Sequence, residues 1–553
     1  MLLTRLQALG PIIEQISKTA GTPGLSLGVL HQGEIVHQAN FGFRHVDAGL
    51  PPDEDTVYVV CSLTKAITAA MVGILVDEGK LSWTTQLHEI LPEFQRAPHD
   101  PANNITVTDI LSHRTGLPSY DSFWLSSHNK IPIPRAEAVS LLSYVPPAAD
   151  LRTEFIYSNL GYEILGQLIE KVSGTKFSTF MTNAILEPLN MTRTFYTTLP
   201  SHFDNVAQGY TALQNASVFP VPSPIYGDDV LMGPAGGVRS SVHDLLILYN
   251  AFIDAANSEI ENRTPIPPQN PLRQLSHILQ GMVSVPLATL REVSYASGWL
   301  RVQLPAPMGP GRGPGIDPML GEGLPSRLGF FHEGNMPGYT TFAAMFPETR
   351  SAVVVLSNSL GLTDTTKLVG QLLIEELFGN TINSTDYTTY AELTAKQAAA
   401  TMSEVKSQLI QSRHTKTPYH SLPTYTGTFY NSIHNFFINI SASTRQLRVH
   451  FMDDEEFVLY PYQLNSFFWF MPHNELVQLA RYTSYPMEYY IIEFGYVGDD
   501  GDSTFDTDSD IINALRWKHE FSVQGKGEIF RMESQKHGPF DQRQQQSVLT
   551  RDT

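Results

Sequence analysis

Segments with strand character occur near residue 30 and again near residue 350, and segments with helical periodicity lie between them. Strands from both ends of a region can share one sheet only if the chain between them leaves the sheet and returns. The pattern therefore predicts an α+β fold, in which an antiparallel sheet with flanking helices is joined to an all-helical insert. The expected strands of this sheet cover residues 25–30, 34–42, 328–332, 340–346 and 352–357.

The sequence Cys61-Ser62-Leu63-Thr64-Lys65 places a serine and a lysine three residues apart, at the start of a helix predicted over Leu63–Glu78. Residues i and i+3 lie on one face of a helix, so the two side chains are expected to be neighbours. An adjacent amine can take the proton of a hydroxyl that is otherwise a poor nucleophile. Serine is also a favoured N-cap residue, so the pair alone fits an ordinary helix start equally well.

Context distinguishes Ser62 from the other serines that have a lysine three residues later. Those other sequences begin at Ser127, Ser173 and Ser403, in polar stretches or at the end of a predicted helix. Ser62 instead follows an apolar strand predicted at Thr56–Cys61. Two more patterns follow in order, Tyr157-Ser158-Asn159 and His332-Glu333-Gly334. The joint occurrence of the three patterns in this order favours serine-dependent acyl transfer.

These patterns resemble those of the class C beta-lactamase-like serine hydrolases, a family that includes esterases, D-aminopeptidases, DD-peptidases and some acyltransferases. The resemblance covers about residues 5–380. Further matching segments are Leu111–Leu117, Asn159–Tyr162, Met232–Gly237 and Gly334–Tyr339. The resemblance implies a DD-peptidase and beta-lactamase-like fold, with the site in the cleft between the sheet and the helical part.

The resemblance also implies a role for each residue of the patterns. Ser62 would be the nucleophile, and Lys65 and Tyr157 would handle its proton, with either one as the base. The backbone N–H groups of Ser62 and Asn335 would form the oxyanion hole. No metal or organic cofactor is implied. The substrate-binding and oxyanion residues would be Asn159, His332, Gly334 and Asn335.

The third pattern departs from that of many penicillin-recognising relatives, in which a lysine stands where this chain has His332. A fixed ammonium group there can hold the carboxylate of a beta-lactam, whereas histidine is mostly neutral at pH 7. The departure favours small neutral esters, thioesters or amides as substrates. We expect His332 to tune Tyr157 by hydrogen bonding; the alternative is a satisfied core histidine on a strand.

The charge composition of the chain argues against one class of binding partner, the nucleic acids. The chain has 36 basic and 55 acidic residues, a formal net charge of −19, and no basic stripe. Binding to a nucleic-acid backbone is therefore not expected, because it requires clustered positive charge. The hydrophobic content of 42% and charged content of 16% are typical of a globular protein. The sequence gives no indication of the oligomeric state.

Cys61 is the only cysteine, so no intrachain disulfide is expected and a reducing compartment fits. It is expected to complete the apolar strand as a buried, inert thiol. The stretch Met1–Ala20 is expected to form one amphipathic helix, and it lacks the apolar core of a secretory signal. The longest apolar run, Ala69–Val76, is too short to span a bilayer. These features predict a cytoplasmic protein without a membrane span.

At 553 residues the chain is too long for one ordinary core. We expect a catalytic domain over 1–380, a linker with one helix over 381–423, a lipocalin-like antiparallel β-barrel over 424–533 and a disordered tail over 534–553. The barrel prediction depends on short, alternating or aromatic strands separated by turns. These strands are expected at 436–440, 446–452, 457–460, 466–471, 489–494 and 511–517.

The segment Pro305–Arg327 contains six glycines and six prolines in 23 residues, so no regular element is expected there. It precedes the third pattern directly. It is either a lid or wall of the site or a passive surface loop.

Three functions are compatible with the patterns. A cofactor-free hydrolase would pass the Ser62 acyl group to water. An acyltransferase of a natural-product pathway would pass it to an alcohol or amine. A non-catalytic ligand-binding or sensor protein would keep Ser62 for capture and form an acyl-enzyme that does not turn over.

Overall fold

A computed structural model describes residues 2–197, 199–200, 203–287, 289–309, 318–379, 385–414, 420–498 and 504–532. The chain forms two compact units. The first unit comprises Met1–Ser407, Met471–Pro486 and Glu520–Gln524. The second comprises Gln408–Phe470, Met487–His519 and the chain from Gly525 onward. The tail expected over 534–553 lies outside the described residues.

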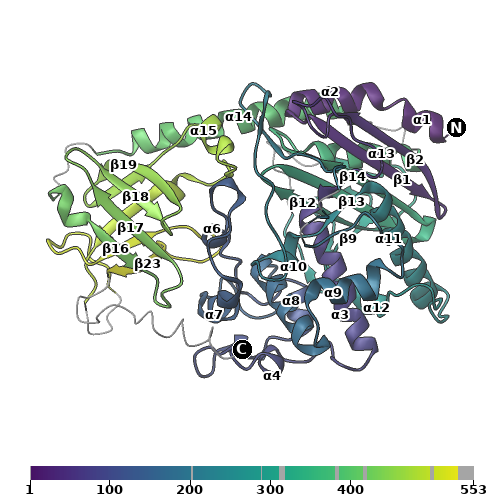
Figure 1. The fold of residues 1–553 in the computed structure, drawn as a ribbon, viewed down its shortest axis with the longest axis horizontal. Helices are drawn as coiled ribbons and strands as arrows, with labels where there is room; N and C mark the ends of the chain where they lie inside the picture. The colour runs from purple at the N-terminus through teal and green to yellow at the C-terminus, as the bar shows by residue number, and fades with distance from the viewer. Residues whose placement is uncertain are drawn as a thin grey trace. The chain divides into compact units, whose positions relative to one another are not determined.

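The first unit contains an eight-stranded antiparallel sheet in which strands from the two ends of the domain lie side by side (Figure 1). This sheet confirms the predicted α+β architecture. Its strand order is β2-β1-β14-β13-β12-β9-β8-β7. The strands are β1 Gly24–His31, β2 Glu34–Gly42, β7 Val283–Ser284, β8 Val293–Tyr295, β9 Leu300–Leu304, β12 Arg327–Met336, β13 Tyr339–Phe346 and β14 Ser351–Ser357. All five expected strands are present, and β7, β8 and β9 extend the sheet beyond β12.

Helices cover both faces of this sheet. Leu25, Leu27 and Val29 alternate along β1 and join one apolar core with the N-terminal helices and α13 (Thr365–Phe378). Gly28 points to the other face, where a Cβ atom would lie 2.6 Å from side chains of α11 (Val242–Ala256). Successive side chains of a strand point to opposite faces of the sheet, so the position of a residue along the strand determines the face on which its side chain packs.

The N-terminal stretch forms two helices instead of the single one expected. They are α1 (Leu2–Gln7) and α2 (Gly10–Ala20). Pro11 lies in the first turn of α2, the position where a missing backbone N–H costs least. The break at residues 8–9 is therefore the end of one helix and the start of the next.

The helical part of the first unit supports the site. Gly166 of α8 (Asn159–Ser173) lets α10 (Gly233–Gly236) approach closely, since a Cβ atom there would lie 2.1 Å from Pro234. The other helices are α3 Thr64–Asp77, α4 Leu87–Ile90, α5 Val107–Leu111, α6 Asp121–Trp124, α7 Ala138–Tyr144, α9 Phe177–Met181, α12 Leu275–Ile278 and α15 His473–Gln478. Short strands accompany them: β3 Tyr58–Val59, β4 Tyr210–Ala212, β5 Val218–Pro220, β6 Arg239–Ser240 and β15 Ser359–Leu360.

The glycine- and proline-rich segment before β12 is partly regular, contrary to expectation. β10 (Ala306–Pro307) pairs with β11 (Met319–Leu320). Ala306, Met308 and Leu320 are buried in the core of the sheet unit. These apolar side chains anchor both ends of the segment, and residues 310–317 between them lie outside the described residues.

The helix expected in the linker extends over Tyr387–Gln411 (α14). Its first turns belong to the first unit, where Tyr387 and Ala391 join the core around the sheet. Among the residues that the structure describes, no helix combines the length and apolar character needed to cross a bilayer.

The second unit is a closed eight-stranded antiparallel barrel, which confirms the predicted barrel. Its strands are β16 Gly427–Tyr430, β17 Phe437–Ala442, β18 Leu447–Phe451, β19 Glu455–Gln463, β20 Ser466–Trp469, β21 Ile491–Gly495, β22 Ala514–Trp517 and β23 Glu528–Met532. The interior is filled with aromatic rings; Trp469 stacks on Phe457 at 4.4 Å, and Phe451 lies 4.7 Å from Trp517. The unexpected strands β16 and β23 pair with each other and close the barrel.

Candidate active site

Ser62 lies in a tight turn between a strand and a helix. The predicted strand Thr56–Cys61 is wrong at its end: β3 covers only Tyr58–Val59, and Cys61–Leu63 form a 3₁₀ turn that leads into α3. Cys61 has a φ of 51°, a left-handed conformation that non-glycine residues rarely adopt. This turn places Ser62 on the lining of a pocket, while the Cys61 thiol stays buried and burial raises its pKa.

Lys65 is completely buried one turn after Ser62. Its Nζ atom lies 3.2 Å from Ser62 Oγ and donates to Asn159 Oδ1 and to the Ala235 carbonyl oxygen, each at 2.8 Å. Burial lowers the pKa of Lys65 to about 7, although the nearby Asp121 carboxylate opposes the shift. A substantial fraction of this amine is therefore neutral near pH 7.

Tyr157 contacts the other side of Ser62. Its hydroxyl donates to Ser62 Oγ at 3.0 Å, and Lys65 Nζ lies 4.8 Å from the centre of its ring. Burial raises the pKa of Tyr157, and this effect outweighs the hydrogen bond to Ser62. The phenol therefore keeps its proton near neutral pH and acts as a hydrogen-bond donor to the serine.

Asn159 begins α8 and connects Lys65 to a buried carboxylate. Its Oδ1 atom accepts from Lys65, and its Nδ2 atom donates to Asp121 Oδ1 and Oδ2 at 3.2 and 3.3 Å. Ser119 and Trp124 also donate to Asp121. Burial raises the pKa of Asp121. Nothing in the sequence pattern around Asp121 predicted its place in this network.

Gly334 brings strand β12 against Ser62. A Cβ atom at this position would lie 2.9 Å from the Ser62 backbone nitrogen and 2.8 Å from Cys61 Cβ, so no larger residue fits. Among the residues that the structure describes, β12 pairs with β9 only as far as Phe331, so its edge from His332 onward has no neighbouring strand and is called the open edge here. The Asn335 carbonyl oxygen at this edge accepts from the Tyr482 hydroxyl. Because N–H and C=O of one strand residue point to the same edge, the Asn335 N–H also faces the open edge.

His332 is buried beside this edge as a neutral imidazole. Its Nδ1 atom donates to the Glu333 carbonyl oxygen at 2.6 Å, and its Nε2 atom accepts from the Tyr295 hydroxyl at 3.1 Å. Both ring nitrogens are thus engaged, and the hydrogen bond expected with Tyr157 is not formed. Burial and the charge of Lys65 lower the pKa of His332 to about 3. The third pattern therefore supplies no positive charge to the site.

A second buried histidine supports Tyr157 from behind. His113 accepts from the Ser158 backbone N–H at 3.1 Å, and its ring lies 4.3 Å from the Tyr157 ring. His113 belongs to the matching segment Leu111–Leu117, so a signal for it existed in the sequence. No such signal existed for Tyr295.

The pocket at Ser62 has a volume of about 430 Å³. Its walls are mainly aromatic and apolar, and its only charged lining side chains within the described residues are Asp121 and Glu333. Part of the wall comes from Met471–Pro486, a segment of the first unit that lies between barrel strands in sequence. The residues that this segment contributes are Tyr482, Ser484 and Tyr485. Within the described ranges, no three His, Cys, Asp or Glu side chains form a group that could hold a metal ion.

Comparison with known proteins supports the resemblance to the beta-lactamase-like serine hydrolases. A family model described as beta-lactamase matches residues 10–375. Protein flp of Staphylococcus aureus (strain MRSA252) is 25% identical over 393 residues, which cover 70% of this chain and 68% of that protein. The unguisins hydrolase ungD' of Aspergillus campestris is 29% identical over 259 residues, or 45% of this chain and 47% of the hydrolase.

Solved structures show the same fold at low identity. The octameric penicillin-binding protein homologue from Pyrococcus abyssi has a TM-score of 0.55 and 20% identity, and the match covers 96% of this chain and all of that one. A class C beta-lactamase has a TM-score of 0.53 and 17% identity, over 69% of this chain and 97% of that one. Because the family model matches most of the sheet unit and all three patterns, the chain belongs to the beta-lactamase family.

Proposed function

We propose that the protein is a serine hydrolase that forms an acyl-enzyme at Ser62 and cleaves small neutral esters, thioesters or amides. The observation that carries this proposal is the run of contacts from the Tyr157 hydroxyl to Ser62 Oγ and on to Lys65 Nζ, at 3.0 and 3.2 Å. A serine is activated when a base lies within hydrogen-bond reach of it and a third group orients that base.

Lys65 is the better candidate for the base. A neutral amine has two N–H bonds and one lone pair, and two carbonyl oxygens 2.8 Å away accept the two N–H bonds. The lone pair is then left for the Ser62 hydroxyl. A pKa of about 7 places Lys65 where a general base works best, whereas Tyr157 has a raised pKa and stays protonated.

The acylation step follows from these positions. Ser62 Oγ attacks the substrate carbonyl carbon while its proton moves to Lys65 Nζ. The N–H groups of Ser62 and Asn335 stabilise the resulting oxyanion. When the bond to the leaving group breaks, that group takes a proton from Lys65, directly or through Tyr157. Water then repeats the sequence, releases the acid and restores Ser62.

The charge of the pocket favours neutral substrates. Asp121 and Glu333 line it, and His332 is neutral. A carboxylate on the substrate would find no fixed cation at the position of His332. The loss of a charge-assisted hydrogen bond costs about 1.5–3 kcal/mol. Beta-lactams, which carry a carboxylate, should therefore be poor substrates.

The relatives named unguisins hydrolase support hydrolysis over transfer to an alcohol or amine. Intact-mass spectrometry with p-nitrophenyl acetate, an acyl thioester and nitrocefin tests the proposal directly. We expect a transient acyl adduct with the first two, faster turnover of these than of nitrocefin, and no adduct in Ser62→Ala.

Three outcomes would change the assignment. An acyl label on a residue other than Ser62 would refute the assignment of Ser62 as the nucleophile. Product that appears only when an alcohol or amine is added would establish an acyltransferase. An adduct that never turns over with any acceptor would establish a capture or sensor protein.

A further inference from the structure

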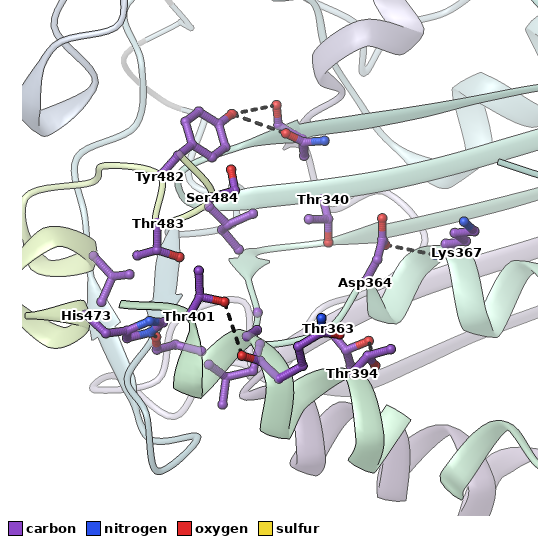
Figure 2. Close-up of a pocket in the computed structure, with 18 of the residues that line it drawn as sticks. Thr340, Thr363, Asp364, Lys367, Thr394, Thr401, His473, Tyr482, Thr483 and Ser484 are labelled. Atoms are coloured by element: carbon purple, nitrogen blue, oxygen red, sulfur yellow. Dashed lines mark hydrogen bonds between the residues drawn. The ribbon is translucent and has the colours of Figure 1, made fainter. Parts of the chain in front are cut away.

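A second cavity of about 220 Å³ lies beside the Ser62 pocket, within the first unit (Figure 2). Its walls come from β12, the start of α13, the face of α14 and the segment Met471–Pro486. Glu333 and Asn335 of β12 have the same orientation as Phe331, which packs in the core under α13. This cavity therefore lies on the α13 side of the strand, whereas Gly334 contacts Ser62 on the other side.

The two cavities meet at the open edge of β12. Glu333, Asn335, Tyr482 and Ser484 line both of them. The Tyr482 hydroxyl donates to the Asn335 carbonyl oxygen at 3.1 Å and to Asn335 Oδ1 at 3.2 Å, as Figure 2 shows for its labelled side chain. A chain that crosses this edge past Tyr482 would reach from the Ser62 pocket into the second cavity.

The charges of the second cavity are already balanced by the protein. Lys367 Nζ lies 3.6 Å from a carboxylate oxygen of Glu333. Asp364 caps α13 and accepts from the Lys367 backbone N–H at 3.0 Å. Arg481 adds a second cation to the lining, so two carboxylates are matched by two cations and a ligand needs to bring no net charge.

Hydrogen-bonding groups define what the ligand must offer. His473 is 4% exposed, and its Nε2 atom lies 3.1 Å from the Ala212 carbonyl oxygen, so Nε2 carries the proton. Its Nδ1 atom is then an acceptor, and it is buried without a hydrogen-bond partner among the described residues. Thr401, Thr483 and Ser484 add hydroxyl groups to the same cavity. A ligand with N–H or O–H groups would relieve the cost of the unsatisfied acceptor.

We propose that this cavity is a subsite for the distal part of the substrate acyl chain, and that it selects an uncharged chain rich in amide groups. Amides supply both the N–H donors that His473 lacks and the carbonyl acceptors that the hydroxyl groups can use. The reacting carbonyl lies at Ser62, and the chain crosses the edge of β12 at Tyr482. This inference rests on the proposed function, because it requires acylation at Ser62.

Four p-nitrophenyl esters test the subsite. Their acyl groups are acetylglycyl, acetyl-triglycyl, an alkyl chain of the same length as acetyl-triglycyl, and a triglycyl chain that ends in a carboxylate. We expect kcat/KM for acetyl-triglycyl to exceed that of the other three about tenfold, the value of one or two net hydrogen bonds. Equal values for the amide and alkyl chains would overturn the selectivity.

A matched pair of variants locates the effect in the cavity. Ala398 of α14 lines it, and Ala400 on the same helix does not. Ala398→Leu should fill the cavity and remove the advantage of acetyl-triglycyl, with little change for the short ester. Ala400→Leu should leave both substrates unchanged. An identical effect of both variants would overturn the assignment.

Binding separates this inference from the proposed function. Acetyl-triglycine amide is titrated into Ser62→Ala, with and without Ala398→Leu, and binding is measured by calorimetry. Binding that Ala398→Leu abolishes supports the subsite even if the wild-type protein is never acylated. Absence of binding, together with normal acylation of Ser62 by the short ester, refutes the subsite alone.

Discussion

The Ser62 pocket and the barrel interior are both buried, but they are filled in different ways. Around Ser62 the chain buries an amine and two imidazoles, those of Lys65, His113 and His332, and positions each with hydrogen bonds. In the barrel, large aromatic rings pack together: Trp469 contacts Phe457, and Trp517 contacts Phe451. Burial of ionisable groups is costly and shifts their pKa values, whereas burial of aromatic rings stabilises a fold.

This difference indicates which substitutions should affect function and which should affect stability. Single substitutions around Ser62 should change rates by large factors and stability little. Substitutions in the barrel interior should lower the stability of the barrel and change the rates little. Four experiments test this contrast.

The largest effect should come from Lys65→Ala and Tyr157→Phe. Each should lower kcat/KM for a neutral ester by about 10³–10⁴-fold, and the double variant little further, because residues that act as one unit are not additive. Steady-state kinetics measure the effect, and unfolding curves control for stability. If the two losses multiply, the residues have separate roles.

Trp469→Ala should destabilise the barrel by about 3–5 kcal/mol, the usual cost of a large aromatic-to-alanine change in a core. The ring is fully buried and lies 4.4 Å from Phe457 and 4.8 Å from Tyr490. Urea unfolding followed by circular dichroism gives the value. Lys65→Met is the matched comparison in the site: it should abolish activity without this loss of stability. A stable Trp469→Ala barrel would contradict the assignment of the rings as its main support.

Activity should fall with pH below about 7. The base must be neutral to accept the Ser62 proton, and the pKa of Lys65 is lowered to about 7 by burial. Well below this value kcat/KM should drop about tenfold per pH unit, which gives about 50-fold between pH 7 and pH 5 because half of the base is already protonated at pH 7. Initial rates with a neutral ester, corrected for its own hydrolysis, give the profile. A flat profile down to pH 5 would exclude Lys65 as the base.

The smallest effect concerns Asp121, whose carboxylate raises the pKa of Lys65 against the effect of burial. Asp121→Asn removes this charge, so the pKa of Lys65 should fall and the acid limb of the profile should move to lower pH. We expect a displacement of less than about one unit, since charge effects are damped by the protein environment. A limb that stays in place, or moves to higher pH, would contradict the coupling.

The sequence predicted the parts of the fold and site that depend on local pattern. The central strands are apolar and periodic, and Ser62 and Lys65 share one helix turn. Both features can therefore be recognised within a few residues of sequence. β7, β8 and β9 span two to five residues each, too few for a period to emerge. β16 and β23 gave no signal either, although they close the barrel.

Long-range contacts could not be predicted in the same way. His332 was expected to bond Tyr157, but Tyr295 takes its Nε2 atom. Asp121 enters the site through Asn159, and Tyr482 through Asn335. Each of these pairings depends on how separate elements meet in three dimensions, and nothing in the local sequence around one partner specifies the other.

The contribution of Tyr482 has a consequence for synthesis of the protein. The ribosome makes the three patterns well before it reaches Met471–Pro486, the segment that completes the wall of the pocket. At bacterial and eukaryotic elongation rates, the interval between His332 and Tyr482 is on the order of 10 s. During that interval the nascent chain has its nucleophile and base but an unfinished pocket, so the order of synthesis delays the mature site until most of the chain has been made.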